Sequence, residues 1–491
     1  DTHRTMKKFL LPLFIFTTSI FITTIASAQI KLPSIIADHM VLQQKTDATL
    51  WGWAEPNEVL EIKGSWNNSM IKATADGSGK WQANIKTTGA GGPYLLTFKG
   101  KNTITISDVY LGEVWLCSGQ SNMDRRVAAM QSPDSVGRSA TNPLIRMFTV
   151  QKQASDVPQE ELKGSWAVNS PETVGTFSAV AYHFGNELAN KLSIPIGLIH
   201  SSWGGTPAES WVNKKVFQTD ESFKPIWNRY EGRIRKYEVD KQNPANQKLV
   251  DPRTHQQAPS VLFNAMIKPL VNYRIKGVIW YQGETNAPRA YQYRKLFPAL
   301  IANWREEFKM AELPFYYVQI APFKGQNPEI REAQLMTLKS VDFVGMAVTT
   351  DVGNCEDIHP TNKIPVGKRL AYIALNKNYN KKGVEWQSPI YNHFEVDGAQ
   401  IKVFFETTSN LVAKGSELKG FKIAGNDQQF YPATAKIQGK TITVYSTEVK
   451  NPVAVRFGWD NCPDVNLFNR AGLPASPFRT DSWKGETEGK N

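Results

Sequence analysis

The pattern of hydrophobic and polar positions divides the chain into several regions. Residues 29–108 contain short β-prone runs separated by turn signals, which is typical of an N-terminal β-sandwich domain. From 109 to 384, apolar strand runs alternate with segments of helical spacing, which predicts a mostly parallel sheet flanked by helices. Residues 385–483 return to β-prone runs and are expected to form a C-terminal β region, while the polar tail at 484–491 is expected to be frayed. The pattern therefore predicts an α/β fold with β regions at both ends.

Spacing also predicts individual elements in the middle region. Ser178 is placed to cap a helix that ends at Leu192, because apolar residues recur between them at helical intervals. Residues 213–258 are polar with little apolar periodicity, so they are predicted as a surface excursion near the rim of the site. The other elements expected here are strands at 113–117, 196–200, 276–281, 315–320 and 343–350, and helices at 291–308, 330–338 and 366–375.

The first of these strands leads to the sharpest chemical signal. The apolar run 113–117 is followed by a tight turn at Gly119 that presents Ser121. A serine hydroxyl is a weak nucleophile, so catalysis needs a base and a set of donors that stabilise an oxyanion. A histidine with acidic neighbours is found at His359, and turns that offer backbone and amide donors are found at 204–205 and 282–284. Each candidate follows a predicted strand, and the ends of parallel strands can converge, which predicts an acyl-transfer site.

Four sequence blocks contain these candidates and their neighbours. They are Ser-Gly-Gln-Ser-Asn-Met (118–123), Ser-Trp-Gly-Gly-Thr (202–206), Trp-Tyr-Gln-Gly-Glu-Thr-Asn (280–286) and Asp-Ile-His-Pro (357–360). In this order they resemble the sialate O-acetylesterases, a carbohydrate-esterase branch of the SGNH/GDSL hydrolase superfamily, and the likeness runs from about residue 30 to about residue 483. The resemblance implies an SGNH-type sheet, no cofactor and an O-acetylated carbohydrate as substrate, although related acetylxylan esterases look similar.

The resemblance implies roles for the catalytic residues. Ser121 is the expected nucleophile and His359 the expected general base. The acid that orients the histidine stays open. The Asp-Ile-His order of this branch favours Asp357, the common SGNH spacing points to Glu356, and Asp351 is a third alternative.

The resemblance also implies an oxyanion hole. Its expected donors are the backbone N–H of Ser121, a glycine of the second block and a polar side chain of the third. These map to Gly205, with Gly204 as the alternative, and to Gln282, where most SGNH enzymes carry asparagine.

Supporting or substrate-binding roles are predicted for a further set of residues. Glu284 is expected to hold Gln282 or Asn122, since a glycosidase acid would need a second carboxylate close by. Arg331 is a candidate partner for a substrate carboxylate such as that of sialic acid, with a surface arginine that has no ligand as the alternative. The tentative set is Gln120, Asn122, Glu284, Arg331 and Glu356.

Three hypotheses for the function follow from these residues. The first is an exported carbohydrate O-acetylesterase, in particular a sialate O-acetylesterase, that works through a serine acyl-enzyme. The second is the same chemistry on acetylated xylan or another glycan. The third is a non-catalytic carbohydrate-binding protein on a hydrolase scaffold, against which the intact Ser121 and His359 argue.

Charge and cysteine content bear on the expected partners, disulfides and metals. The formal net charge is +12, but the Lys and Arg residues are scattered and no nucleic-acid-binding motif is found, so no nucleic-acid partner is expected. The three cysteines exclude a disulfide-built scaffold. A Cys117–Cys355 bridge is possible in an oxidising compartment, with unpaired thiols as the default expectation. No ligand spacing typical of a metal site occurs, so no metal is predicted.

Residues 1–28 are predicted to be a leader and signal peptide. Two lysines near Met6 precede an apolar run from Phe9 to Ile25, and Ala26-Ser-Ala28 forms a small-residue cleavage site. We therefore expect a mature chain that begins near Gln29, is exported to the periplasm or beyond, and has no stable membrane insertion after cleavage.

Overall fold

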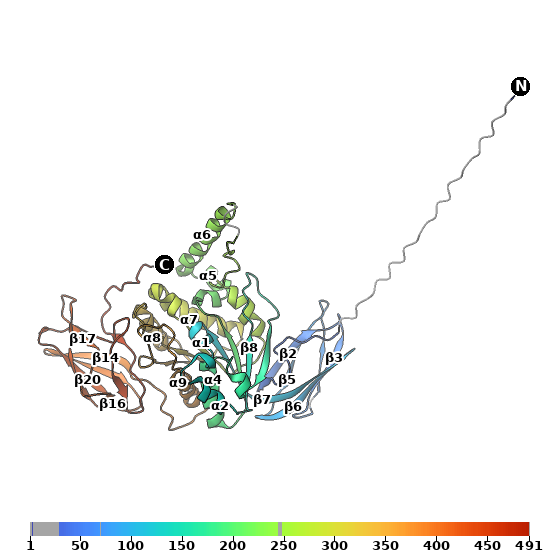
Figure 1. Ribbon diagram of the computed structural model, residues 1–491, viewed down its shortest axis with the longest axis horizontal. Coiled ribbons are helices and arrows are strands. Elements are labelled where there is room, and N and C mark those ends of the chain that lie inside the picture. The colour runs from blue at the N-terminus through green and yellow to red at the C-terminus, as the bar shows by residue number, and fades with distance from the viewer. Residues whose placement is uncertain (1, 3–28, 69, 244–247, 491) are drawn as a thin grey trace.

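The computed structural model describes residues 2, 29–68, 70–243 and 248–490 (Figure 1). The predicted signal peptide lies outside the described residues. Among the residues that are described, the helices are too short or too polar to cross a membrane.

A mixed sheet of 11 strands forms the centre of the molecule (Figure 1). Its main path has the order β13-β12-β11-β7-β10-β8-β9. Neighbours from β13 to β8 are parallel, and β9 is antiparallel to β8. The expected α/β class is therefore confirmed, although the sheet as a whole is mixed. These strands are β7 (Thr103–Gly119), β8 (Ile145–Val150), β9 (Gly164–Val168), β10 (Ile196–Ser202), β11 (Gly277–Tyr281), β12 (Phe315–Val318) and β13 (Val344–Ala347).

The long strand β7 joins the N-terminal strands to this sheet. It runs without a break across the expected boundary at residue 108. One part of it pairs with β1 and β6, and β6 continues through β3 to β4. Strands β2 and β5 form a separate two-stranded sheet, so the sandwich itself stays a prediction. The bounds are β1 (Val41–Gln43), β2 (Asp47–Trp53), β3 (Val59–Gly64), β4 (Met70–Thr74), β5 (Lys80–Lys86) and β6 (Gly91–Lys99).

Helices flank the parallel part of the sheet where the spacing predicts them (Figure 1). The Ser178 hydroxyl accepts the backbone N–H of Ala181 at 3.2 Å, which confirms the expected helix cap. The α-helices are α1 (Ser121–Asp124), α2 (Pro133–Ser139), α3 (Pro171–Val174), α4 (Ala179–Leu192), α5 (Lys214–Thr219), α6 (Lys224–Asp240), α7 (Ala290–Glu307), α8 (Glu329–Ser340) and α9 (Ile364–Lys377).

The polar segment 213–258 contains two helices that the sequence analysis missed. α5 is short, and α6 projects from the body of the molecule (Figure 1). Ile226 and Tyr230 are buried and lie one helical turn apart, while most of α6 is polar. Two apolar residues make too narrow a stripe to stand out as a helical pattern.

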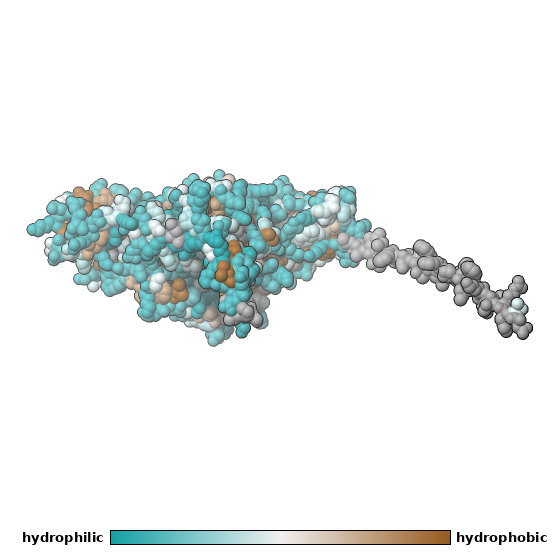
Figure 2. Space-filling view, turned by 90° about the horizontal axis from the view of Figure 1, so that it is seen from above, coloured by the Kyte–Doolittle hydropathy of each residue, from teal (hydrophilic) through white to brown (hydrophobic). Residues whose placement is uncertain are grey.

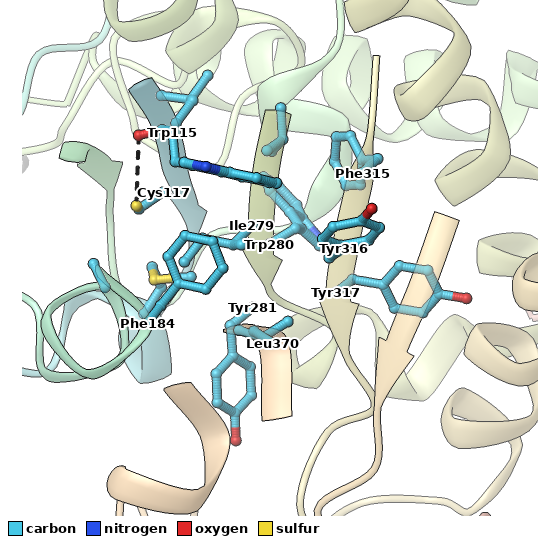
Figure 3. Close-up of a cluster of buried hydrophobic side chains, with 14 of the residues drawn as sticks. Trp115, Cys117, Phe184, Ile279, Trp280, Tyr281, Phe315, Tyr316, Tyr317 and Leu370 are labelled. Atoms are coloured by element: carbon cyan, nitrogen blue, oxygen red, sulfur yellow. Dashed lines mark hydrogen bonds between the residues drawn. The ribbon is translucent and has the colours of Figure 1, made fainter. Parts of the chain in front are cut away.

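Aromatic side chains pack against both faces of the sheet (Figure 3). On one face, Trp280 of β11 packs against Phe297 and Trp304 of α7, with ring centroids 6.5 and 5.7 Å away. On the other, Trp115 of β7 packs against Phe184 of α4 at 5.0 Å. Alternate residues of a strand point to opposite faces, so strands of this kind are apolar on both sides. The surface seen in Figure 2 is largely hydrophilic, with hydrophobic residues in small separate patches.

The C-terminal β region lies beyond α9 and contains two four-stranded sheets and a two-stranded sheet (Figure 1). This confirms the expectation of a β region at 385–483, whose β-prone runs at 401–405, 441–445 and 452–456 overlap β15, β20 and β21. Its strands are β14 (Ile390–Asp397), β15 (Gln400–Glu406), β16 (Leu411–Ala413), β17 (Phe421–Ala424), β18 (Phe430–Pro432), β19 (Thr434–Gln438), β20 (Thr441–Tyr445), β21 (Ala454–Phe457), β22 (Leu467–Asn469) and β23 (Phe478–Arg479).

The polar tail is bound to the body of the protein, so the prediction of a frayed tail is wrong. The buried carboxylate of Glu329, at the start of α8, accepts the backbone N–H groups of Glu486 at 2.5 Å and Thr487 at 3.1 Å. The Thr487 hydroxyl donates to the same carboxylate. The polar composition of the tail suggested that nothing holds it, but charge-assisted hydrogen bonds to the buried Glu329 carboxylate fix it in place.

The packing of Trp280 against α7 allows a test of how much this part of the core contributes to the free energy of unfolding. Trp280→Ala removes a fully buried ring from the contact between β11 and α7, and should lower the free energy of unfolding by about 3–5 kcal/mol. Val396→Ala is the control, because Val396 is 54% exposed and its loss should cost well under about 1 kcal/mol. Chemical denaturation measures both. Equal losses in the two variants would contradict this assignment of the core.

Candidate active site

The first three sequence blocks meet at one edge of the sheet. Gly119, at the end of β7, pairs in register with Ser202 of β10 on one side and Tyr281 of β11 on the other. All three strands are parallel, so their carboxyl ends lie side by side. Ser121 follows two residues after Gly119, and is therefore next to both other blocks.

The turn that presents Ser121 requires glycine at position 119. Its φ is +137°, and an added Cβ would lie 2.1 Å from the carbonyl oxygen of Tyr281. The next residue, Gln120, donates its backbone N–H to that same oxygen at 2.9 Å. The chain then turns into α1, with Ser121 as a partly exposed first residue. The close approach to β11 thus fixes where the serine emerges.

The histidine loop, residues 348–363 between β13 and α9, lies against this turn. The side-chain nitrogen Nδ2 of Asn122 donates to the carbonyl oxygen of Ile358 at 3.0 Å. Asn122 directly follows Ser121, and Ile358 directly precedes His359. A backbone bond of 3.0 Å from Gln131 to Thr361 adds a second contact. The structure therefore brings the fourth block to the first.

Of the three candidate acids, Asp357 is the one that contacts the histidine. Its Oδ1 accepts the backbone N–H of His359 at 2.8 Å and lies 3.7 Å from the ring nitrogen Nδ1, which is longer than a hydrogen bond. Asp351 instead forms a bidentate ion pair with Arg369, with both distances 2.7 Å. Glu356 is exposed and pairs with Lys324.

The surroundings of His359 favour its neutral form. Partial burial lowers the pKa of its imidazole below the usual value of 6.5, and the positive charge of Arg125 lowers it further. The carboxylate of Asp357 acts in the opposite direction. A neutral imidazole can accept a proton, which a general base must do. Arg125 lies four residues after Ser121, and the sequence analysis did not consider it.

The second block forms a tight turn beside the serine. A Cβ added to Gly204 would lie 3.2 Å from the Cβ of Ser121, so Gly204 packs directly against it. Gly205 is exposed, has a φ of +72°, and accepts the side-chain amide of Gln257 on its carbonyl oxygen at 2.8 Å. Both glycines predicted as alternatives are thus at the site, and Gly204 contacts the serine.

The amide of Gln282 already has partners within the protein. It is fully buried, and its Nε2 donates to Asn286 Oδ1 at 2.6 Å and, more weakly, to the carbonyl oxygen of Thr206 at 3.4 Å. Its Oε1 accepts the hydroxyl of Tyr293 at 3.0 Å. To donate to an oxyanion, Nε2 of Gln282 must give up one of these two hydrogen bonds. The bond to Thr206 is the longer and therefore the weaker of the two. The sequence analysis gave no role to Asn286, the last residue of the third block, and did not consider Tyr293, which lies eleven positions after Gln282.

Buried polar side chains hold the serine turn in place through hydrogen bonds. Gln120 Oε1 accepts the backbone N–H of Thr285 at 3.2 Å. Glu284, at the start of the 3-10 helix Glu284–Arg289, accepts Asn122 Nδ2 at 2.6 Å, in agreement with one of the two partners expected for it. Lys363 donates to Asn122 Oδ1 at 2.5 Å. No motif pointed to Lys363, which is a single lysine just before α9.

Arg331 does not occupy the place that either prediction gave it. Its side chain is fully buried at the start of α8, so it is neither on the surface nor open to a substrate carboxylate. The guanidinium donates to the carbonyl oxygens of Asp460 and, at 3.4 Å, Asn461. It therefore joins helix α8 to the C-terminal β region, which its sequence neighbourhood did not indicate.

The cysteine pairing differs from both expectations, because Cys117 and Cys355 are not bonded to each other and two of the three thiols are not unpaired. Cys355 of the histidine loop bonds to Cys462, which lies between β21 and β22 in the C-terminal β region. Cys117 is a buried free thiol in the middle of the sheet, where burial raises its pKa. Cys117 and Cys355 lie close in sequence to Ser121 and His359, but Cys117 belongs to an interior strand and is not bonded to Cys355. The disulfide anchors the loop that carries His359.

Among the described residues, no group of three or more His, Cys, Asp or Glu side chains is arranged to hold a metal ion. The polar side chains of the serine turn and the loops next to it are instead a hydroxyl, an imidazole, carboxylates and amides.

Comparison with known proteins shows similarity to carbohydrate esterases. The family model described as "Carbohydrate esterase, sialic acid-specific acetylesterase" matches residues 111–245 and 253–376. Sialate O-acetylesterases from Rattus norvegicus and Homo sapiens are 30% and 29% identical over 91% of this chain, and the matches cover 94% and 92% of those proteins. The crystal structure of a carbohydrate acetylesterase from Xanthomonas citri is 37% identical, with a TM-score of 0.83 over 92% of this chain and 100% of that one.

The disulfide provides a test of how the histidine loop is anchored. Cys355 and Cys462 are 107 positions apart, so the bridge closes a long loop. The variant Cys355→Ser/Cys462→Ser should lose about 2–5 kcal/mol of the free energy of unfolding. Denaturation with and without dithiothreitol measures the loss. Dithiothreitol should destabilise the wild type and leave the double variant unchanged, whereas an equal response of both would contradict the pairing.

Proposed function

The chain belongs to the sialic acid-specific acetylesterase family of carbohydrate esterases, and we propose that it is an exported serine hydrolase that removes O-acetyl groups from sugars, with O-acetylated sialic acid as its substrate. The observation that supports this most is the bond from Asn122 to Ile358, because it holds the segment of His359 against the segment of Ser121. A nucleophile and a base from distant blocks then share one site.

In the first half of the proposed reaction, the Ser121 hydroxyl oxygen attacks the acetyl carbonyl carbon while His359 takes its proton. Asp357 lies beside Nδ1, which leaves Nε2 to face the serine. The tetrahedral intermediate then collapses, and the bond to the sugar oxygen breaks. The sugar leaves as a hydroxyl with the proton from His359, and the acetyl group stays on Ser121.

In the second half, His359 takes a proton from water, whose oxygen attacks the acetyl carbon. The bond to Ser121 breaks, acetate leaves, and the proton returns to the serine. The proposed oxyanion donors are the backbone N–H groups of Ser121 and of the second-block turn at 204–205, with Gln282 able to join them if it releases Thr206. A donor of this kind contributes a factor of about 10²–10³ to the rate.

Export is part of the proposal. The predicted signal peptide supports it, and so does the Cys355–Cys462 bond, since disulfides persist in oxidising compartments. The preference for sialic acid is supported by the matching family model. The earlier candidate for binding its carboxylate, Arg331, is buried and takes no part in this proposal.

Substitution of the nucleophile tests the reaction. Ser121→Ala should lower the rate of acetate release from p-nitrophenyl acetate by at least about 10³-fold, because the acyl-enzyme can no longer form. Ser210→Ala is the control, since Ser210 is buried and its hydroxyl has no hydrogen-bond partner among the described residues. A Ser121 variant as active as the wild type would reject this nucleophile, and wild-type protein that binds sugar without releasing acetate would favour a binding protein.

The choice of substrate is tested by parallel assays of acetate release from O-acetylated sialic acid and from acetylated xylan. The proposal predicts the higher kcat/KM on the sialic acid. A higher kcat/KM on acetylated xylan would support the same reaction but identify xylan, not sialic acid, as the preferred substrate.

The pH profile tests the state of His359. Because burial and Arg125 lower its pKa, the imidazole should be neutral at lower pH than usual, and kcat/KM should rise with a midpoint below pH 6.5. Arg125→Met removes a neighbouring positive charge, so the pKa of His359 should rise and the midpoint should move to higher pH. The measurement is kcat/KM against pH for both proteins. A midpoint that does not move, or moves down, would contradict this role of Arg125.

A further inference from the structure

Two buried side chains of opposite charge lie on either side of Asn122. Lys363 Nζ is 2.5 Å from Asn122 Oδ1, and Glu284 Oε1 is 2.6 Å from Asn122 Nδ2. The exposed fractions of Lys363, Asn122 and Glu284 are 0%, 1% and 7%. A buried charge is costly unless polar groups compensate it, so this arrangement of a cation, an amide and an anion calls for an explanation.

The charges dictate which way the amide faces. The oxygen and nitrogen ends of an asparagine amide have nearly the same shape, but the oxygen only accepts hydrogen bonds and the nitrogen only donates them. In the observed orientation the oxygen meets the ammonium group of Lys363 and the nitrogen meets the carboxylate of Glu284. A reversed amide would place donor against donor and acceptor against acceptor, in a site where low polarity strengthens the repulsion.

This orientation decides whether the histidine loop is held. Besides donating to Glu284, Asn122 Nδ2 donates to the carbonyl oxygen of Ile358 at 3.0 Å. In the reversed orientation two oxygens would face each other at that distance, and the contact would be repulsive. The peptide that leads to His359 therefore stays in place only while the amide is correctly oriented.

We propose that Lys363 and Glu284 are positioning residues, whose opposite charges orient the Asn122 amide so that it holds the Ile358 carbonyl and sets His359 opposite Ser121. This inference rests on the proposed esterase function and assigns neither residue any contact with the substrate. It gives a role to Lys363, which lies outside all four sequence blocks, and a definite partner to Glu284.

The surroundings of Lys363 act on its charge in opposite directions. Its Nζ lies 5.3 Å from the ring centroid of Tyr281, which Figure 3 shows at the edge of the aromatic cluster. Burial, opposed by the charge of Glu284, lowers the pKa of Lys363 to about 7, and Arg125 and Asp357 act on it in opposite directions. The positive charge of Lys363 also helps to lower the pKa of His359.

The variant Lys363→Met tests the proposal, because it keeps a long side chain and removes both the charge and the donor. With p-nitrophenyl acetate, kcat should fall by about 10²-fold from the misplaced histidine. KM should change by less than about threefold, since this substrate does not touch Lys363. The midpoint of the rise in kcat/KM with pH should move up, because a positive charge near His359 is gone. A purely structural role would lower the stability of the variant but leave kcat of the folded protein unchanged.

The matched control is Lys377→Met, at the other end of α9, where Nζ donates to the carbonyl oxygen of Val344 at 2.8 Å. It removes a bonded lysine from the same helix and should leave kcat and the pH midpoint unchanged. Thermal unfolding of each variant shows that it is folded. Lys363→Met leaves the buried carboxylate of Glu284 without its cation, and the variant could fail to fold for that reason. In that case the double variant Lys363→Met/Glu284→Gln, which removes both charges, is assayed instead, with the same expected changes in kcat and KM.

Two results would overturn the proposal. One is a folded Lys363→Met protein, or its neutral double variant, with kcat within about threefold of the wild type. The other is a loss confined to KM. Wild-type protein that releases no acetate would overturn the esterase function and this inference together, whereas an active wild type with an equally active Lys363 variant would overturn the inference alone.

Discussion

The hydrogen bond from the Asn122 side chain to the carbonyl oxygen of Ile358 is the contact on which the site depends. It joins residues 236 positions apart, and each is the direct neighbour of a proposed catalytic residue. A serine and a histidine form a catalytic pair only within hydrogen-bond reach of each other. One amide, itself held by a buried lysine and a buried glutamate, provides that link here.

The rest of the fold positions the two segments that this hydrogen bond joins, the serine turn and the histidine loop. The parallel strands β7, β10 and β11 end side by side, so the serine turn, the glycine turn and the third block converge with no long loops between strand and site. The histidine loop comes from the far strand β13 and needs more support. The Cys355–Cys462 bond anchors it to the C-terminal β region, and Arg331 of helix α8 bonds to the same region. The C-terminal strands thus support the site although they contribute no proposed catalytic residue.

Sequence analysis succeeded where the signal is local. Strand β10 and helix α4 begin where apolar spacing and the Ser178 cap place them, because both patterns are read from neighbouring residues. It failed where a side chain is defined by a distant partner. Nothing near Arg331 shows that its guanidinium is buried against residues 460–461, and nothing near Cys355 indicates Cys462 over Cys117. Lys363 went unnoticed for the same reason.

The most direct test of the account is covalent labelling of the nucleophile. An organophosphate ester such as diethyl p-nitrophenyl phosphate reacts with a serine that an adjacent base activates, and mass spectrometry of the digested protein locates the phosphoryl group. The account predicts one group on the wild-type chain, at Ser121, and labelling that is far slower in His359→Asn. Labelling of a different residue, or labelling of Ser121 at the same rate without His359, would contradict it.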